Sequence, residues 1–113
     1  MRLTSAMWFA VFMRTEGARG AYVSVVKSGA QQAGALFIMQ NHLNGTLDLY
    51  APAPQALMDE PDGDDRQFER VLESVTQQEI DTYLEKQKNF DPDLWIIETE
   101  SGSGEISLSL AKP

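Results

Sequence analysis

The residues best suited to chemistry in this sequence are carboxylates near the ends of predicted strands, with two aromatic residues beside them. Carboxylates that converge can hold a hard metal cation for hydrolysis, or can act as general acid and general base. The aromatic side chains would add binding surface. The candidate site residues are Asp48, Tyr50, Asp91, Asp93, Trp95 and Glu98. The alternative function that they suggest is a carboxylate-based, metal-assisted hydrolase.

The other parts of a catalytic site are missing from the sequence. His42 is the only histidine, and no nucleophile motif or His-x-x-x-His pair accompanies it. The chain has no cysteine, which excludes disulfides, thiol catalysis and cysteine-based metal centres. Gly29 and Gly34 are spaced as in a phosphate-binding loop, but no Lys-Ser/Thr pair follows the second glycine. We therefore expect no cofactor and favour a function without catalysis.

An acidic stretch at 59–65 invites comparison with a calcium-binding loop. Placing Gly63 at the sixth position of an EF-hand loop brings Glu60 and Asp62 to ligand positions. The first ligand position is then Met58, which has no oxygen in its side chain to offer. Clustered like charges without partners stay in water, so we expect a solvated loop and no metal site.

The net charge of −8 is concentrated in the second half of the chain. Residues 1–58 carry four basic and two acidic side chains, a net charge of +2, whereas residues 59–113 carry five basic and fifteen acidic side chains, a net charge of −10. An acidic half repels phosphate backbones, which argues against nucleic acid as a partner. The longest apolar run, Ala6–Met13, is too short to cross a bilayer. We expect a soluble, cytoplasmic protein that does not bind membranes.

The central element predicted from the sequence is a β-hairpin within residues 35–55. Asn44-Gly45 is the strongest short hairpin signal, because a type I′ turn needs positive φ at both central residues. A two-residue turn there places Leu43 opposite Thr46 and fixes all later pairs. One predicted face carries Phe37, Met39 and Tyr50, and the other carries Leu36, Ile38, Leu47 and Leu49. Both faces are apolar, so the hairpin needs cover on two sides.

Capping signals predict a helix before the hairpin and another after it. The segment Leu3–Ala18 has apolar residues at helical spacing and Thr4 or Ser5 as its N-cap, although a fully buried strand is the competing interpretation. Thr76–Glu79 forms a capping box that begins a second helix, and Pro92 closes this run.

Shorter segments supply the remaining predicted elements. Ala21–Lys27 is rich in β-branched residues, and Leu94–Glu100 places its apolar residues on both faces, so both are predicted strands. Gln67–Ser74 fits either a helix or a strand, and we favour a short helix. Residues 101–113 begin with a Ser-Gly hinge and form either an edge strand or a flexible tail.

Together these elements predict a single globular domain over residues 1–100, followed by the tail at 101–113. A chain of this length buries roughly two-thirds of the surface that it exposes when unfolded. The predicted fold class is α/β or α+β, with a small, mostly antiparallel sheet built on the central hairpin and packed with two or three helices.

Four segments of the chain carry a family resemblance. They are Arg2–Trp8 (R-L-T-S-A-M-W), Asp48–Gln55 (D-L-Y-A-P-A-P-Q), Arg66–Arg70 (R-Q-F-E-R) and Phe90–Glu100 (F-D-P-D-L-W-I-I-E-T-E). With these motifs the chain resembles the bacterial domain of unknown function family 1491. The resemblance implies a small α/β domain and assigns no catalytic residue, ligand or partner. The chain departs from the family pattern at Ala51, where glycine is expected, and at Ser28–Ala30, where a more basic loop is expected.

The expected function follows from the two apolar faces of the hairpin. Apolar sheet area that helices leave uncovered is usually buried against a partner. We expect a non-catalytic module that binds another protein or self-associates as a homodimer, with the contact on one hairpin face. The competing expectation is a monomer, in which helices from both ends of the chain sandwich the sheet.

Overall fold

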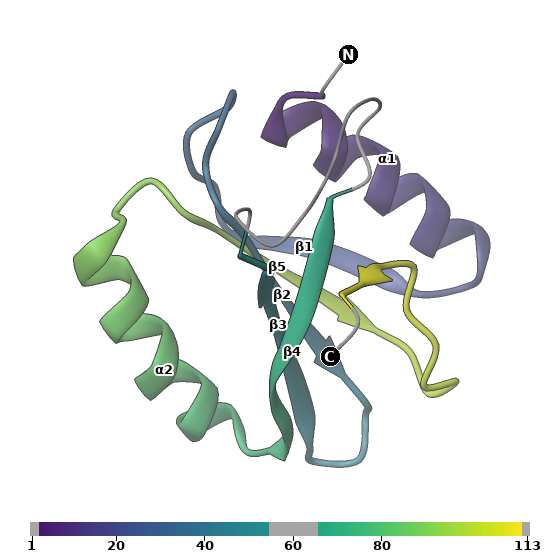
Figure 1. Ribbon diagram of the computed structural model, residues 1–113. Coiled ribbons are helices and arrows are strands. Elements are labelled where there is room, and N and C mark those ends of the chain that lie inside the picture. The colour runs from purple at the N-terminus through teal and green to yellow at the C-terminus, as the bar shows by residue number, and fades with distance from the viewer. Residues whose placement is uncertain (1–2, 55–65, 112–113) are drawn as a thin grey trace.

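The computed structural model describes residues 3–54 and 66–111 of the 113-residue chain. Within these ranges two helices lie on opposite sides of one six-stranded sheet (Figure 1). The elements are α1 (Ser5–Ala18), β1 (Tyr22–Lys27), β2 (Leu36–Asn41), β3 (Leu47–Pro52), β4 (Gln67–Val75), α2 (Gln77–Phe90), β5 (Trp95–Glu100) and β6 (Ser109–Leu110). The strand order is β1-β5-β2-β3-β4-β6.

The sheet is mixed, which corrects the prediction of a mostly antiparallel sheet. β5 lies between β1 and β2, antiparallel to β1 and parallel to β2, and β6 is parallel to β4. A parallel pair needs a crossover connection, and α2 lies in the connection that returns the chain to β2. Trp95, Ile96 and Ile97 are all buried, as expected for a strand covered on both faces.

The register of the hairpin differs from the prediction by one residue. The turn has three residues, Leu43–Gly45, and the His42 N–H donates to the Thr46 carbonyl at 3.1 Å. φ is 62° at Leu43 and 91° at Gly45, so a glycine is needed in the second of these positions. A one-residue shift moves a whole strand's side chains to the other face. The predicted faces were therefore wrong, and Tyr50 lies on the same face as Leu36 and Ile38.

Two apolar clusters fill the spaces between the sheet and the helices. On the α1 side the buried members are Phe12, Val23, Leu36, Ile38, Tyr50, Phe68, Trp95 and Ile97. On the α2 side they are Phe37, Met39, Leu47, Leu49, Ala51, Ile80, Leu84, Leu94 and Ile96. Both hairpin faces are thus covered within the chain, and neither offers the exposed surface that we expected for a contact.

Both helices begin where the capping signals place them. The Thr4 hydroxyl accepts a hydrogen bond from the Met7 N–H at 3.1 Å at the start of α1, and the Thr76 hydroxyl accepts one from the Glu79 N–H at 3.2 Å at the start of α2. These bonds satisfy amides that the first turn of a helix leaves without an internal partner. The predicted N-terminal helix and Thr76-capped helix are confirmed.

The segment from Gln67 to Val75 is a strand, not the short helix that we favoured. β3 is buried on both faces and needs a hydrogen-bonding partner on each edge, and β4 supplies one of them. This pairing outweighs a local helical spacing, because strand preference depends strongly on the neighbouring strands. The described residues therefore contain two helices, and the fold is α+β.

Close packing explains the glycines of the loop between β1 and β2. A Cβ atom on Gly29 or Gly34 would collide with the backbone of the turn at Asp93 and Leu94. The Ala30 N–H donates to the Asp93 carbonyl at 2.9 Å in the same contact. The two glycines let the loop approach this turn, so their spacing needs no phosphate ligand.

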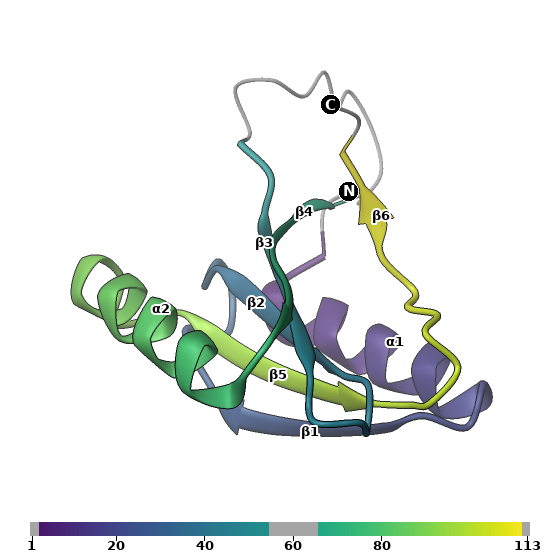
Figure 2. The same cartoon turned by 90° about the horizontal axis from the view of Figure 1, so that it is seen from below.

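The C-terminal segment crosses the α1 side of the sheet before it reaches β4 (Figure 2). Ile106 and Leu108 pack against the α1-side cluster, and Ser109–Leu110 pair with Gln67 and Phe68. The domain boundary at residue 100 stays a prediction.

The predicted acidic loop at 59–65 lies outside the described residues. No helix in the described ranges is both long enough and apolar enough to span a membrane.

Candidate functional site

The carboxylates predicted to form a site lie far apart in the fold. Asp91 and Asp93 are in the turn before β5, whereas Asp48 and Glu98 lie toward the other end of the sheet. Asp48 is on the α1 side, since it pairs with Gln40, and Glu98 is on the α2 side. Within residues 3–54 and 66–111, no three histidine, aspartate or glutamate side chains come together as a metal ion would require. The hydrolase hypothesis lacks the convergence on which it depends.

The predicted site residues around the β5 turn have structural contacts. The Asp91 Oδ1 atom accepts a hydrogen bond from the Asp93 N–H at 3.0 Å, which closes the turn. The Trp95 indole N–H donates to the Ala30 carbonyl at 2.8 Å, and its ring stacks on Phe9 with 6.0 Å between centroids. These contacts fasten the β1–β2 loop and α1 to the start of β5.

Asp48 is a buried carboxylate with three partners. Its Oδ1 atom accepts a hydrogen bond from the Ser74 N–H at 2.8 Å and lies 3.2 Å from His42 Nε2. Its Oδ2 atom lies 3.5 Å from Arg70 Nη1. The sequence assigned His42 no orienting partner. In the observed register Asp48 lies opposite Gln40, one residue away from its predicted partner, and this shift brings the Asp48 carboxylate to the side of the hairpin where the His42 imidazole lies.

Tyr50 lies on the same side of β3 as Asp48 and is linked through Gln40 to the C-terminal segment. The Tyr50 hydroxyl donates to Gln40 Oε1 at 2.9 Å, and Gln40 Nε2 donates to the Gly104 carbonyl at 3.1 Å. Burial raises the pKa of Tyr50, and the charge of Asp48 raises it further, while Arg70 opposes both effects. The phenol is thus kept in the protonated form that donates to Gln40.

Glu16 is a buried functional group that the sequence analysis missed. Its carboxylate is fully buried and accepts hydrogen bonds from Arg19 Nη2 at 2.6 Å, the Thr99 hydroxyl at 2.8 Å and the Ser107 N–H at 2.8 Å. Burial raises the pKa of Glu16, but the hydrogen bonds from Ser107, Arg19 and Thr99 outweigh it and the pKa is lowered. The sequence signal was that Glu16 is the one acidic residue of α1 and lies four positions after the apolar Phe12, on the same helix face.

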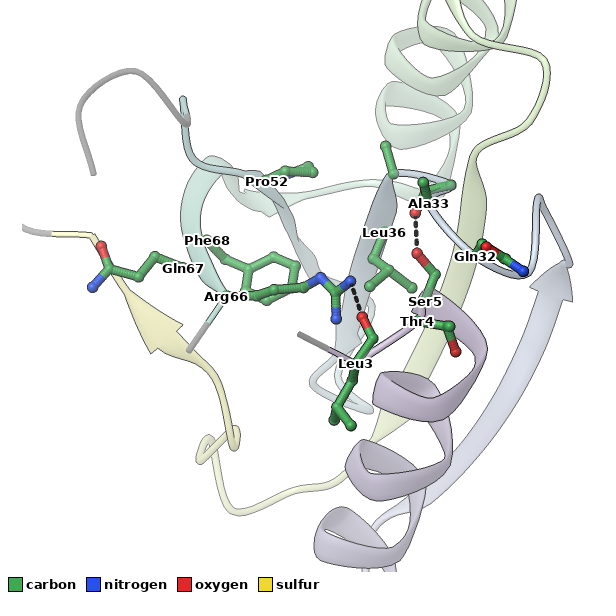
Figure 3. A pocket seen from close by; sticks show the side chains of 12 residues that line it. Leu3, Thr4, Ser5, Gln32, Ala33, Leu36, Pro52, Arg66, Gln67 and Phe68 are labelled. Carbon is green, nitrogen blue, oxygen red and sulfur yellow. Dashed lines mark hydrogen bonds between the residues drawn. The ribbon is translucent and has the colours of Figure 1, made fainter. Parts of the chain in front are cut away.

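A cleft of about 500 Å³ opens at the start of α1, and we call it the α1 cleft (Figure 3). It is lined by residues 3–5, 32–36, 52 and 66–68, which come from α1, the loop before β2 and the facing ends of β3 and β4. Arg66 Nη2 donates to the Leu3 carbonyl at 2.7 Å. None of the predicted site residues lines this cleft.

An apolar surface follows the outer edge strand β1. Among the described strands, β1 pairs only with β5 and forms one end of the sheet. Tyr22 is 67% exposed, Val26 is 55% exposed and Val25 is 41% exposed. We call the surface formed by these residues the β1 edge. The sequence predicted this segment as a strand but did not show that it lies at an edge of the sheet.

Comparisons with known proteins agree with this fold. The chain is 38% identical to protein Atu0922 from A. tumefaciens, whose solution structure matches with a TM-score of 0.86 over 100% of this chain and 98% of that one. It is 24% identical to a DUF1491 family protein from Caulobacter crescentus CB15, whose crystal structure matches with a TM-score of 0.78 over 99% of this chain and 100% of that one. The latter likeness shows the fold alone.

A search of curated proteins finds no significant match. The family model described as "Protein of unknown function (DUF1491)" matches residues 3–109, nearly the whole chain. This confirms the resemblance inferred from the four sequence motifs, and the chain belongs to the DUF1491 family.

Proposed function

We propose that this protein is a non-catalytic module that self-associates by pairing its β1 edge with that of a second copy. The observation that carries the proposal is the contrast between the two ends of the sheet. A strand at a sheet edge presents backbone N–H and C=O groups that can pair with another strand. Proteins usually protect such edges with charges, bulges or covering segments.

The β4 end of the sheet is protected in this way. β6 covers Gln67 and Phe68, and the remainder of β4 carries Glu69, Arg70 and Glu73. Charged side chains on an edge disfavour pairing with a second strand. This end of the sheet is unsuited to association.

The β1 end has little such protection. Its sequence, Tyr-Val-Ser-Val-Val-Lys, contains one charge, and that charge is at the last position. The Lys27 ammonium group donates inward, to the carbonyls of Pro92 at 2.8 Å and Leu94 at 2.9 Å. The register shift between Val25 and Lys27 is also confined to the end of the strand. Most of β1 therefore remains suited to strand pairing.

A sheet with one edge available for strand pairing and one protected edge favours a closed dimer. Antiparallel pairing of β1 with its copy places the same surface on both sides of a two-fold axis. The β1 edges of both copies are then paired with each other, and the outer ends of the joined sheet are the protected β4 ends. This arrangement favours a dimer over an open filament.

Sedimentation equilibrium across a roughly hundredfold concentration range tests this assembly through mass action. The wild-type protein is expected to reach dimer mass as its concentration rises, and Val25→Lys to stay at monomer mass, because the substitution places a charge in the middle of the edge. Phe90→Lys is the matched control, since Phe90 is 86% exposed at the end of α2, outside β1. It should dimerise like the wild type.

Two outcomes would contradict the proposal. Monomer mass for the wild type at every concentration removes self-association. Dimer mass that persists in Val25→Lys removes β1 as the interface. Thermal melting of each variant, measured in parallel, distinguishes a lost interface from a lost fold.

A further inference from the structure

Alternate residues of β5 turn their backbone groups toward opposite neighbours. The Trp95 N–H donates to the Ala35 carbonyl, just before β2, at 2.7 Å. Because β2 and β5 pair in parallel with Leu36 opposite Trp95, Trp95 and every second residue after it turn their N–H and C=O groups toward β2. The residues between them, which include Glu98 and Glu100, therefore turn theirs toward β1.

This alternation determines which residues of β1 can pair with a second copy. Tyr22 and Ser24 lie opposite the β5 residues that face β1, so their own backbone groups are turned toward β5. Val23 and Val25 alternate with them and turn their N–H and C=O groups outward, on the side of β1 that lies at the end of the sheet (Figure 2). A second strand can therefore form backbone hydrogen bonds at Val23 and Val25.

A two-fold antiparallel pair can bring these outward groups together in three registers, with its axis at Val23, Ser24 or Val25. An axis at Val25 places Val23 opposite Lys27, whose backbone groups face β5 beyond the register shift. An axis at Val23 leaves the exposed Val26 opposite a position before β1 begins. The axis at Ser24 pairs Val23 with Val25 of the second copy, and so uses the outward groups of both residues in both copies.

The axis at Ser24 also brings together the most exposed apolar side chains of β1. Tyr22 and Val26 are 67% and 55% exposed, and by strand alternation they lie on the α2 side, across the sheet from Val23. In this register Tyr22 lies opposite Val26 of the second copy, twice in the dimer. An aromatic residue opposite a β-branched residue is a favourable cross-strand pair, and side chains are closest in pairs without direct hydrogen bonds, such as this one. The two side chains therefore cover each other.

From these observations we infer that the two-fold axis of the dimer passes through Ser24, and that Tyr22 and Val26 recognise the second copy by lying opposite each other. The inference rests on the proposed function, because it requires association through β1. It goes further by selecting one register of three. The surface selects a second copy of this chain, since an aromatic residue and a β-branched residue four positions apart meet their complements when the same strand runs in reverse.

Disulfide cross-linking tests the register, because the chain has no cysteine of its own. An axis at Ser24 places the Cα atoms of the two Ser24 residues about 4.5 Å apart, in a pair without direct hydrogen bonds. A disulfide spans Cα separations of about 4.4–6.8 Å. Ser24→Cys in a glutathione redox buffer should therefore form a covalent dimer, detected by mass spectrometry without reductant.

A mixture of two further variants tests the contact between side chains. Equal amounts of Tyr22→Cys and Val26→Cys should form a mixed covalent dimer, whereas neither variant should do so alone. Phe90→Cys is the matched control for collision, because Phe90 is 86% exposed at the end of α2, outside β1. Ser24→Cys should cross-link at least about tenfold faster than this control, since pairing raises the local concentration of the thiols. Thermal melting of each reduced variant reports whether it is folded.

The other two registers predict different cross-links. An axis at Val23 would join Tyr22→Cys to Ser24→Cys, and an axis at Val25 would join Ser24→Cys to Val26→Cys. Either result, or no cross-link above the collision control in a wild-type protein that sediments as a dimer, would overturn the register and leave self-association intact. Monomer mass for the wild type at every concentration would overturn the proposed function and the register together.

Discussion

Replacing Glu16 with glutamine should strongly weaken the attachment of the C-terminal segment to the sheet. The buried carboxylate accepts hydrogen bonds from the Thr99 hydroxyl, the Ser107 N–H and the Arg19 guanidinium. A hydrogen bond to a charged group contributes about 1.5–3 kcal/mol. The Arg19 side chain is 35% exposed, so we discount its contribution for solvent screening. Glutamine keeps one acceptor oxygen and can donate to the Thr99 hydroxyl, so Glu16→Gln removes the charge from these bonds and not the bonds themselves. At about 1 kcal/mol for each of the bonds to Thr99 and Ser107, the expected loss is about 2 kcal/mol.

The effect of Glu16→Gln should depend on pH. The pKa of Glu16 is lowered in the folded protein, so the unfolded chain binds its proton more readily. The carboxylate therefore contributes its full stability above its unfolded pKa of about 4.3, and that contribution is lost as the pH falls through the lower, folded pKa. The difference in unfolding free energy between wild type and variant should be constant near neutral pH and shrink below about pH 4.

Urea denaturation of wild type and variant at several pH values measures both quantities. Glu105→Gln is the control, because Glu105 also binds Arg19, at 2.9 Å, but is 71% exposed. This surface substitution should change stability by no more than about 0.5 kcal/mol. Equal stability of Glu16→Gln and Glu105→Gln at neutral pH would refute the role assigned to the buried carboxylate.

Three further outcomes are expected. Gly45→Val should lower stability by more than about 1 kcal/mol, because a β-branched residue is forced to positive φ, and an unchanged melting midpoint would contradict the turn geometry. Ser74→Gly should raise stability by about 0.5–1 kcal/mol, since φ is 54° at Ser74 and glycine adopts this conformation without strain; a loss in urea denaturation would show that the Ser74 side chain is required. Millimolar calcium should leave the melting temperature unchanged, and a saturable rise abolished by Asp62→Asn would instead establish a metal site in the acidic stretch.

Local signals in this sequence predicted local structure well. The Thr4 and Thr76 caps depend on residues within one turn of each other, and both helices begin at these positions. The hairpin required more than local information. Asn44 and Gly45 do lie in the turn, but Asn44 Oδ1 accepts the Thr46 N–H at 3.0 Å in a turn of three residues. One additional turn residue changed every cross-strand pair, as the two-residue period of a strand requires.

The wrong element type for β4 and the missed parallel pairing of β5 both arose from contacts that are distant in sequence. Phe68, Val71 and Leu72 fit helical spacing, and only the buried edge of β3 selects a strand. β5 carries buried residues on both faces, but its position between β1 and β2 is set by the path of α2. No pattern within either segment contains this information.

The candidate site was predicted less well than the fold, because polar residues were judged by type before their partners were known. Asp48 and Tyr50 lie on the same side of β3, but Asp48 is held by His42, Arg70 and Ser74, whereas Tyr50 binds Gln40. Glu16 and Ser107 are 91 residues apart, so sequence spacing could not reveal that the Ser107 N–H donates to the Glu16 carboxylate. Buried polar groups need partners, so their presence alone indicates a network and not a reaction.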